Sequence, residues 1–235
     1  MKLNLHSIFL ILLLSISQIA CKTTTTEVVI LLDLTEETFN HISINDFRSI
    51  SSLEKDVFNG EEVRIQPITE NGFNGIESYK IKSVISPLIG NEYQRRNELN
   101  KFYYSIDSTF QILKQGRSRR NGSVIFKILS EELNRLNESD ADSKVLIINS
   151  DLMENSFIDF TNSVNTNRIK NTPNEIEEQL IEKYPLGDLK DINIYIVYKP
   201  LNKWDSERFE IVSDFYKNLL EYRGANVNIS GNLIY

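Results

Sequence analysis

The feature that most constrains the fold is a short apolar run near the N-terminus that ends abruptly in polar residues. The run is Val28–Leu32, and the five residues after it read Asp33-Leu34-Thr35-Glu36-Glu37. A short, β-branched apolar run closed by polar residues is typical of a strand buried on both faces of a parallel sheet. Ligand sites in open α/β sheets form beyond the carboxyl ends of such strands. We therefore expect Asp33 and Thr35 to lie in a crevice of this kind.

Two later apolar segments have the same character. Val145–Ile148 is followed by the polar cluster Asn149–Asp151, and Ile192–Tyr198 is followed by Lys199-Pro200. A short segment, 227–229, predicts a final strand. Residues 63–67 and 79–84 alternate between apolar and polar residues with Asn-Gly turn signals between them, which predicts a β-hairpin. Pro67 cannot donate a ladder hydrogen bond, so this part of the sheet is expected near an edge.

Apolar residues three and four positions apart predict amphipathic helices over 99–113, 125–136 and 204–219. The spacing over 39–53 is less regular, with Asn45-Asp46 interrupting or capping it and Asn59-Gly60 closing it as a C-cap. Thr172-Pro173-Asn174-Glu175 predicts a helix start with Thr172 as N-cap.

The order of these elements defines the fold class. Strands alternate with helices along the chain, which predicts an α/β protein with a three-layer, doubly wound, mostly parallel sheet. One strand of the hairpin must run antiparallel. No internal repeat and no interior linker is present, so residues 28–235 are expected to form one domain.

The N-terminus reads as a targeting segment. An apolar core from about Leu5 to Ile16 is too short to span a bilayer, which needs about 20 residues, and it leads through Ala20 to the one cysteine of the chain, Cys21. This pattern predicts a lipoprotein signal peptide at 1–20, lipidation of Cys21 and a polar tether at 21–27. A plain secretory signal or an uncleaved anchor is the alternative.

The lipoprotein interpretation places the domain in the cell envelope, anchored to a membrane and facing the periplasm or the exterior. With Cys21 acylated, the mature chain has no thiol and must fold by packing alone. The net charge of −7 gives no electrostatic support to a nucleic-acid partner.

The strand ends bring together a candidate metal site. If the strands that precede Asp33 and Asp151 are neighbours, both carboxylates point into one crevice, with Thr35 beside them and Ser123 at the start of a helix. Oxygen ligands of this kind suit Mg²⁺ or Mn²⁺. His41 is the one histidine outside the signal segment, so a zinc site lacks ligands. Ser123 also fits an ordinary helix N-cap, and the two roles are compatible.

Asp33-x-Thr35-x-Glu37 resembles the first motif, D-x-[ST]-x-S, of the metal-ion-dependent adhesion site of von Willebrand factor A (vWA) domains. Gly122-Ser123 resembles the loop that carries the family's Thr, and Asp151 resembles its second Asp, although this chain has Leu152 where the family usually has Gly. The resemblance covers the mature chain. It implies a sheet with one antiparallel edge strand and a metal whose coordination shell is completed by a partner's acidic side chain.

Glu37 stands where the family has Ser, so the first motif keeps two of its three ligand positions. Glu37 as a direct ligand would add negative charge and weaken the metal's attraction for a partner's carboxylate. Turned outward, it would leave a weak or non-functional site.

Three possible functions are compared. The first is a binding module that contacts another protein through the strand-end crevice, with or without metal. The second is a structural envelope component whose acids serve as caps and turn residues. The third is a phosphohydrolase with Asp33 as nucleophile, but Thr35 occupies the position where that chemistry needs a second Asp, and no Ser-His or Cys-His pair can be assembled. We predict a binding module that is not an enzyme.

Overall fold

The computed structural model describes residues 23–35, 42–69, 75–84, 91–115 and 122–233. Cys21, Glu37 and the predicted signal peptide lie outside these residues, as does Phe39 at the start of the first predicted helix. Both hydrophobic clusters of the protein are built from residues 28 onward, so residues 22–235 contain the whole described core.

Six strands form one sheet in the order β3-β2-β1-β4-β5-β6. All neighbouring pairs are parallel except β2 and β3, which form the predicted antiparallel hairpin with β3 at the edge. The strands are β1 (Thr25–Asp33), β2 (Gly60–Ile68), β3 (Glu77–Ile81), β4 (Ser143–Asn149), β5 (Ile192–Val197) and β6 (Asn226–Ser230).

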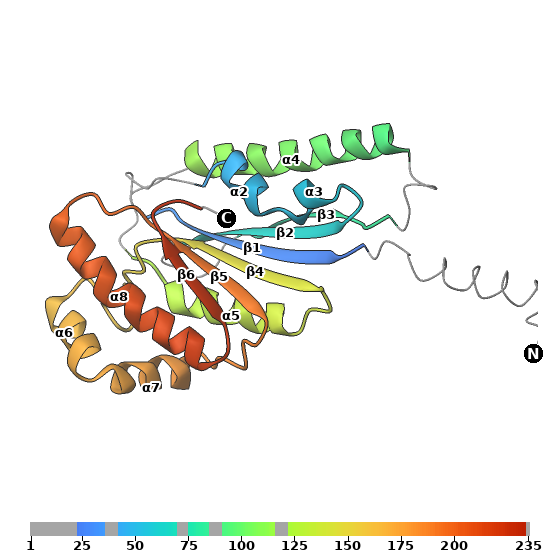
Figure 1. Cartoon of the computed structure of the whole chain (residues 1–235). Helices are drawn as coiled ribbons and strands as arrows, with labels where there is room; N and C mark the ends of the chain where they lie inside the picture. Colours follow the sequence, from blue (N-terminus) through green and yellow to red (C-terminus); the bar gives the residue numbers. More distant parts are fainter. Residues whose placement is uncertain (1–22, 36–41, 70–74, 85–90, 116–121, 234–235) are drawn as a thin grey trace, which may run out of the picture.

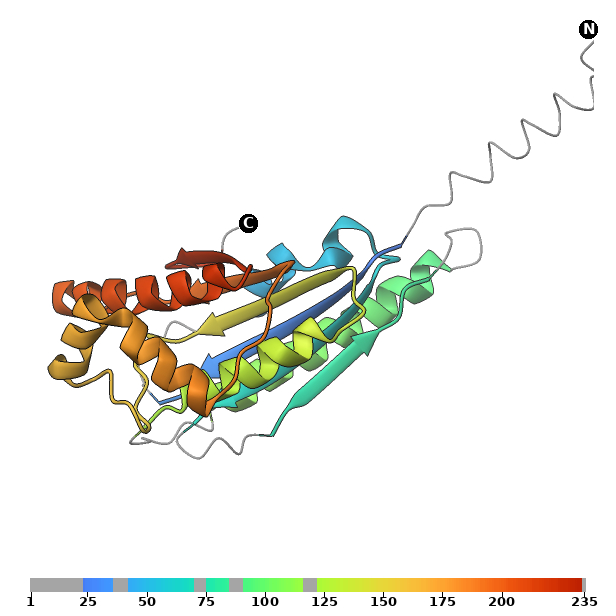
Figure 2. The same ribbon diagram turned by 90° about the horizontal axis from the view of Figure 1, so that it is seen from below.

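Helices cover both faces of the sheet, so the protein has the predicted three layers (Figure 1). One face carries α2 (Ile44–Ile50), α3 (Ser52–Lys55) and α4 (Glu92–Gln115). The other carries α5 (Ile125–Asn137), α6 (Ser163–Asn171), α7 (Pro173–Lys183) and α8 (Lys203–Tyr222). Figure 2 shows α5 lying across β1 and β4.

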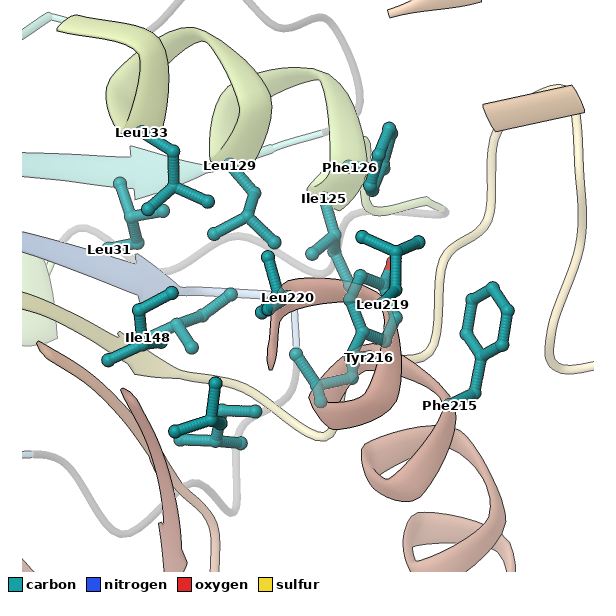
Figure 3. Packing of buried hydrophobic residues seen from close by; sticks show 14 of the residues in the cluster. Leu31, Ile125, Phe126, Leu129, Leu133, Ile148, Phe215, Tyr216, Leu219 and Leu220 are labelled. Carbon is teal, nitrogen blue, oxygen red and sulfur yellow. The ribbon is translucent and has the colours of Figure 1, made fainter. Parts of the chain in front are cut away.

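The two faces of β1 explain why its sequence is continuously apolar. Val29 and Leu31 belong to the cluster beneath α5 and α8, whereas Val28, Ile30 and Leu32 belong to the cluster beneath α2 and α4. Successive side chains of a strand point to opposite faces, so a strand covered on both sides needs apolar residues at every position. Figure 3 shows Leu31 and Ile148 facing Leu129 and Leu133 of α5, with Leu220 of α8 beside them.

Some predicted boundaries are wrong in detail. β1 begins at Thr25 and pairs with β2 and β4 from there, so Thr25–Glu27 belong to the sheet rather than to the tether. Gly60 is not a helix C-cap, because α3 ends at Lys55 and Gly60 is the first residue of β2. A Cβ at Gly60 would lie 2.8 Å from the backbone nitrogen of Ser83, so close backbone approach explains this glycine.

The helix starts also differ from expectation in places. Asp46 is part of a capping box with Ser43 at the start of α2, which confirms its capping role. Pro173 is the first residue of α7, but the Thr172 side chain does not cap that helix and instead donates to the carbonyl of Arg168 in α6. α6 was not predicted, because it has few apolar residues. Trp204 was predicted on the buried face of α8, yet its side chain is 64% exposed.

Among the helices of the described residues, none is both long enough and apolar enough to cross a membrane.

Candidate functional site

The strand order reverses between β1 and β4, which are direct neighbours although they are separated along the chain by β2, β3 and the four helices α2, α3, α4 and α5. Leu32 of β1 lies opposite Asn149 of β4, so the residues that follow these two strands emerge side by side. This is the topological switch point at which open α/β sheets form their ligand crevices. Asp33 ends β1, and Ser150 and Asp151 follow β4.

Asp33 is completely buried and is surrounded by hydroxyl groups. Its Oδ1 accepts hydrogen bonds from the Thr35 backbone nitrogen at 3.1 Å and from the Thr35 hydroxyl at 2.6 Å. Ser123 Oγ lies 3.5 Å from the same oxygen and 3.0 Å from Thr35 Oγ1. Oδ2 accepts from Ser150 Oγ at 2.7 Å. Three of the predicted site residues, Asp33, Thr35 and Ser123, are therefore brought together.

The spacing of these oxygens suits a small divalent cation. Ligand oxygens about 2.1 Å from an octahedral Mg²⁺ lie about 3 Å apart in neighbouring positions. Asp33 Oδ1, Thr35 Oγ1 and Ser123 Oγ form a triangle with edges of 2.6, 3.0 and 3.5 Å. Hydroxyl and carboxylate oxygens are the donors that Mg²⁺ and Mn²⁺ prefer. The donor set fits such an ion, with the hydroxyls turning their lone pairs toward it.

Carboxylates alone do not make this site. Within the ranges that the structure describes, no three His, Cys, Asp or Glu side chains gather where they could hold one metal ion. The cluster instead contains one carboxylate and three hydroxyls. Glu37, the predicted fifth-position ligand, lies outside those ranges.

Ser123 is held in place by its backbone and by the neighbouring segments. The backbone nitrogen of Asn155 donates to the Ser123 carbonyl at 2.9 Å, and that of Val124 donates to the Thr69 carbonyl, just after β2, at 3.3 Å. The loop after β4 and the end of β2 thus both fix the start of α5. The predicted role of Ser123 as an N-cap is wrong, because Val124 is the N-cap residue and the Ser123 hydroxyl points to Thr35.

The N-terminus of α5 is capped by Glu154, a residue that sequence reasoning missed. Glu154 Oε2 accepts hydrogen bonds from the backbone nitrogens of Ile125 at 2.9 Å and Phe126 at 2.7 Å. A carboxylate at this position satisfies donors that a helix start leaves unpaired and interacts favourably with the helix dipole. The acid is far from the helix in sequence, so no local capping pattern could have revealed it.

Asp151 and Leu152 form a tight turn after β4. Asp151 is nearly buried, and its Oδ1 accepts from the Met153 backbone nitrogen at 2.9 Å. Ser150, not predicted as a site residue, supplies the hydroxyl from this strand end that bonds to Asp33. Leu152 has a φ of 62°, in the left-handed region that favours glycine. The turn thus keeps a glycine-like backbone at the position where vWA domains usually have Gly.

The buried acids of the site have shifted ionisation. Burial raises the pKa of Asp33, while the hydrogen bonds from Thr35 and Ser150 act in the opposite direction. Burial also raises the pKa of Glu154 to about 7, and the charge of Asp33 contributes to this rise. Two carboxyl groups with raised pKa values therefore lie near the start of α5.

Comparison with known proteins does not assign the chain to a family. No protein-family description matches the sequence, and no curated protein matches it. Among solved structures, the chain is similar to the conserved hypothetical protein BatB from Bacteroides thetaiotaomicron, with 12% sequence identity and a TM-score of 0.39. The alignment covers 88% of this chain and 91% of that one. The sheet order, the antiparallel edge strand and the helices on both faces define a vWA-like or Rossmann-like α/β fold.

Proposed function

We propose that this protein is a membrane-anchored, extracytoplasmic vWA-like module that binds another protein through its strand-end crevice. In this proposal Asp33, Thr35 and Ser123 hold Mg²⁺ or Mn²⁺, and Glu37 is a further expected ligand. Asp151, also expected at this site, has a side-chain oxygen that accepts from the Met153 backbone nitrogen and is not one of the oxygens gathered around Asp33. A partner's acidic side chain completes the coordination of the ion. Cys21 carries the lipid that keeps the domain at the membrane.

The observation that carries this proposal is the oxygen triangle at the switch point. Burying a carboxylate is costly unless it is paired or hydrogen-bonded. Among the described residues, the groups that contact Asp33 are three hydroxyls and the Thr35 backbone nitrogen, none of which carries a positive charge. A bound divalent cation would supply such a charge. The loop after β4 is fixed to the start of α5, but Ser150–Glu154 are buried, so the part of this loop that a partner could meet begins at Asn155.

The same geometry favours binding over catalysis by Asp33. Thr35 stands where an Asp-dependent phosphohydrolase needs a second Asp as its acid/base, and the Thr35 hydroxyl instead donates to Asp33 Oδ1 at 2.6 Å. The proposal therefore assigns Asp33 to a binding site and not to phosphoryl transfer.

Thermal unfolding of residues 22–235 in EDTA and in about 10 mM Mg²⁺ or Mn²⁺ tests the metal site. A dissociation constant of about 0.1–1 mM predicts a gain of about 1.4–2.7 kcal/mol, which is a rise of several degrees in Tm for a domain of this size. Thr35→Val keeps the shape of the side chain but removes one ligand oxygen, so the rise should largely disappear.

Thr109→Val is the matched control. Thr109 is a buried threonine on α4, on the face of the sheet opposite to α5, and its hydroxyl is hydrogen-bonded to that of Tyr79 on β3. This variant should keep the full metal-dependent rise. A wild-type Tm that does not respond to either metal would reject the metal site. If both variants lost the metal-dependent rise in Tm equally, general destabilisation would explain the loss.

A further inference from the structure

A groove separate from the strand-end crevice runs between α8 and the pair formed by α6 and α7, which lie beside it in Figure 1. Its volume is about 900 Å³. The floor consists of apolar side chains from α6 and α8: Ile169, Ile211, Phe215 and Leu219. The groove thus lies on the outer surface, away from the sheet, and combines an apolar floor, most of it little exposed, with polar walls.

Two exposed aromatic residues mark the ends of the groove. Trp204 is 64% exposed and Tyr222 is 86% exposed, and both belong to α8. They are 18 positions apart, which places them about 27 Å apart along the helix. Large aromatic side chains left in water beside an apolar floor are typical of interaction surfaces.

The rim of the groove is predominantly acidic. Lys170 contributes a positive charge, and Arg208 is directed inward, with its guanidinium 4.4 Å from the centre of the Trp204 ring and bonded to the Phe160 carbonyl at 3.3 Å. Four carboxylates line the groove: Glu177, Glu207, Glu210 and Asp214. Glu177 is paired with Arg223 at 3.6 Å and Glu207 with Lys203 at 3.7 Å, so Glu210 and Asp214 are the acids most available to a basic partner.

We propose that this groove binds an amphipathic helix of a protein partner, whose apolar stripe is flanked by Lys or Arg. About 18 helical residues span the distance from Trp204 to Tyr222, and an apolar floor with charged rims is the geometry by which grooves bind amphipathic helices. The carboxylates of the rim attract the partner's basic side chains. This inference does not depend on the metal site.

The charge of the groove argues against two other occupants. A second copy of the chain placed across the groove would bring the carboxylates of both copies together, and like charges at an interface are unfavourable. A membrane with anionic lipids would be repelled by the same carboxylates.

Trp204 provides the signal for a test, because it is the one tryptophan of the chain. The probe is an 18-residue peptide that lacks Trp, with Leu along one helical face and Lys on both flanks. Added to residues 22–235, it should shift the Trp204 emission to shorter wavelength as the ring leaves water. A peptide with Glu in place of each Lys should not shift it.

Two double variants with the same change in charge locate the binding. Glu210→Lys with Asp214→Lys changes the groove and should weaken binding of the Lys peptide at least tenfold. Glu92→Lys with Glu98→Lys changes exposed acids of α4, on the opposite face of the sheet, and should alter the affinity less than twofold. All four positions are exposed, and circular dichroism checks that each variant is folded.

Three results would overturn the proposal. Equal weakening in both double variants would mean that the peptide responds to net charge rather than to the groove. A dimer in sedimentation equilibrium that Trp204→Ala dissociates would assign the groove to a second copy. The same emission shift with vesicles of anionic lipid would assign it to a membrane surface.

Discussion

Ser150 directly follows β4, Asp33 ends the adjacent strand β1, and a hydrogen bond of 2.7 Å runs from the Ser150 hydroxyl to Asp33 Oδ2. Both side chains are completely buried. The bond ties the end of β1 to the loop after β4, and the Ser150 hydroxyl also accepts from the Leu152 backbone nitrogen at 3.0 Å. One hydroxyl therefore orients both the central carboxylate of the site and the strained turn beside it.

Ser150→Ala should lower the free energy of unfolding by about 1–3 kcal/mol, because a hydrogen bond to a completely buried carboxyl group is lost. Urea denaturation measures the change. Ser105→Ala on α4 removes a solvent-exposed hydroxyl that bonds to the Lys101 carbonyl, and it should change stability by less than about 0.5 kcal/mol. Similar effects of the two substitutions would contradict a special role for the Ser150 hydroxyl.

Glu154 should make stability depend on pH. Its pKa rises from 4.5 in the unfolded chain to about 7 in the folded protein. The folded state therefore binds this proton more tightly than the unfolded chain does. The resulting contribution of Glu154 to the free energy of unfolding is fully present below about pH 4.5 and is lost as the pH rises through about 7. Its size is up to about 3 kcal/mol.

Glu154→Gln isolates this contribution, because the amide oxygen can still accept from Ile125 and Phe126 but does not titrate. Asp33 also has a raised pKa and adds to the pH dependence of wild-type stability. The quantity to compare is therefore the difference in free energy of unfolding between wild type and Glu154→Gln at each pH. Between about pH 4.5 and 7, the stability of wild type should fall relative to that of Glu154→Gln. Parallel stability curves would refute the assignment.

Gly60→Ala should destabilise the protein by about 1–3 kcal/mol. Its new methyl group would lie 2.8 Å from the Ser83 backbone nitrogen, which is too close for a carbon atom. Gly75→Ala is the control, since no atom lies within 4 Å of its added Cβ, and its stability should not fall. Chemical denaturation of both variants checks the difference, and a neutral Gly60→Ala would show that the backbone approach is easily relaxed.

Cys21→Ser should abolish lipidation. In cells supplied with a labelled fatty acid, the full-length wild-type chain is expected to incorporate the label and the Cys21→Ser variant is not. Ser17→Ala, which keeps the cysteine, should behave as wild type. A wild-type chain without label would favour a plain secretory signal or an uncleaved anchor.

Much of the fold follows from local patterns. The continuous apolar runs of β1 and β4 reflect burial on both faces, and the alternation of 63–67 and 79–84 reflects a hairpin at the sheet edge, so both were predictable. α6 was missed because only Val164 and Ile169 interrupt its polar sequence, and Val164 is itself exposed. Trp204 was misplaced because hydrophobic spacing does not distinguish a core residue from an aromatic residue on an outer groove.

The site was predicted less completely than the fold. The sequence predicted that Asp33, Thr35 and Ser123 come together, because the strand order makes strand ends and a helix start converge at the switch point. Ser150 and Glu154 were missed, because their roles depend on which side chain of a tight turn points inward. The backbone at Leu152 sets that choice through its positive φ, and a leucine in the sequence does not indicate a positive φ.

Direct binding of Mn²⁺ tests the central claim, because the electron paramagnetic resonance signal of free Mn²⁺ is lost when the ion binds. The account predicts one Mn²⁺ per chain for residues 22–235, no binding for Asp33→Asn, and unchanged binding for Glu61→Gln. Glu61 is also a buried carboxylate but bonds to Ser51 and Ser52 near α3. Absence of binding at millimolar Mn²⁺, or binding that persists in Asp33→Asn, would contradict the proposed site.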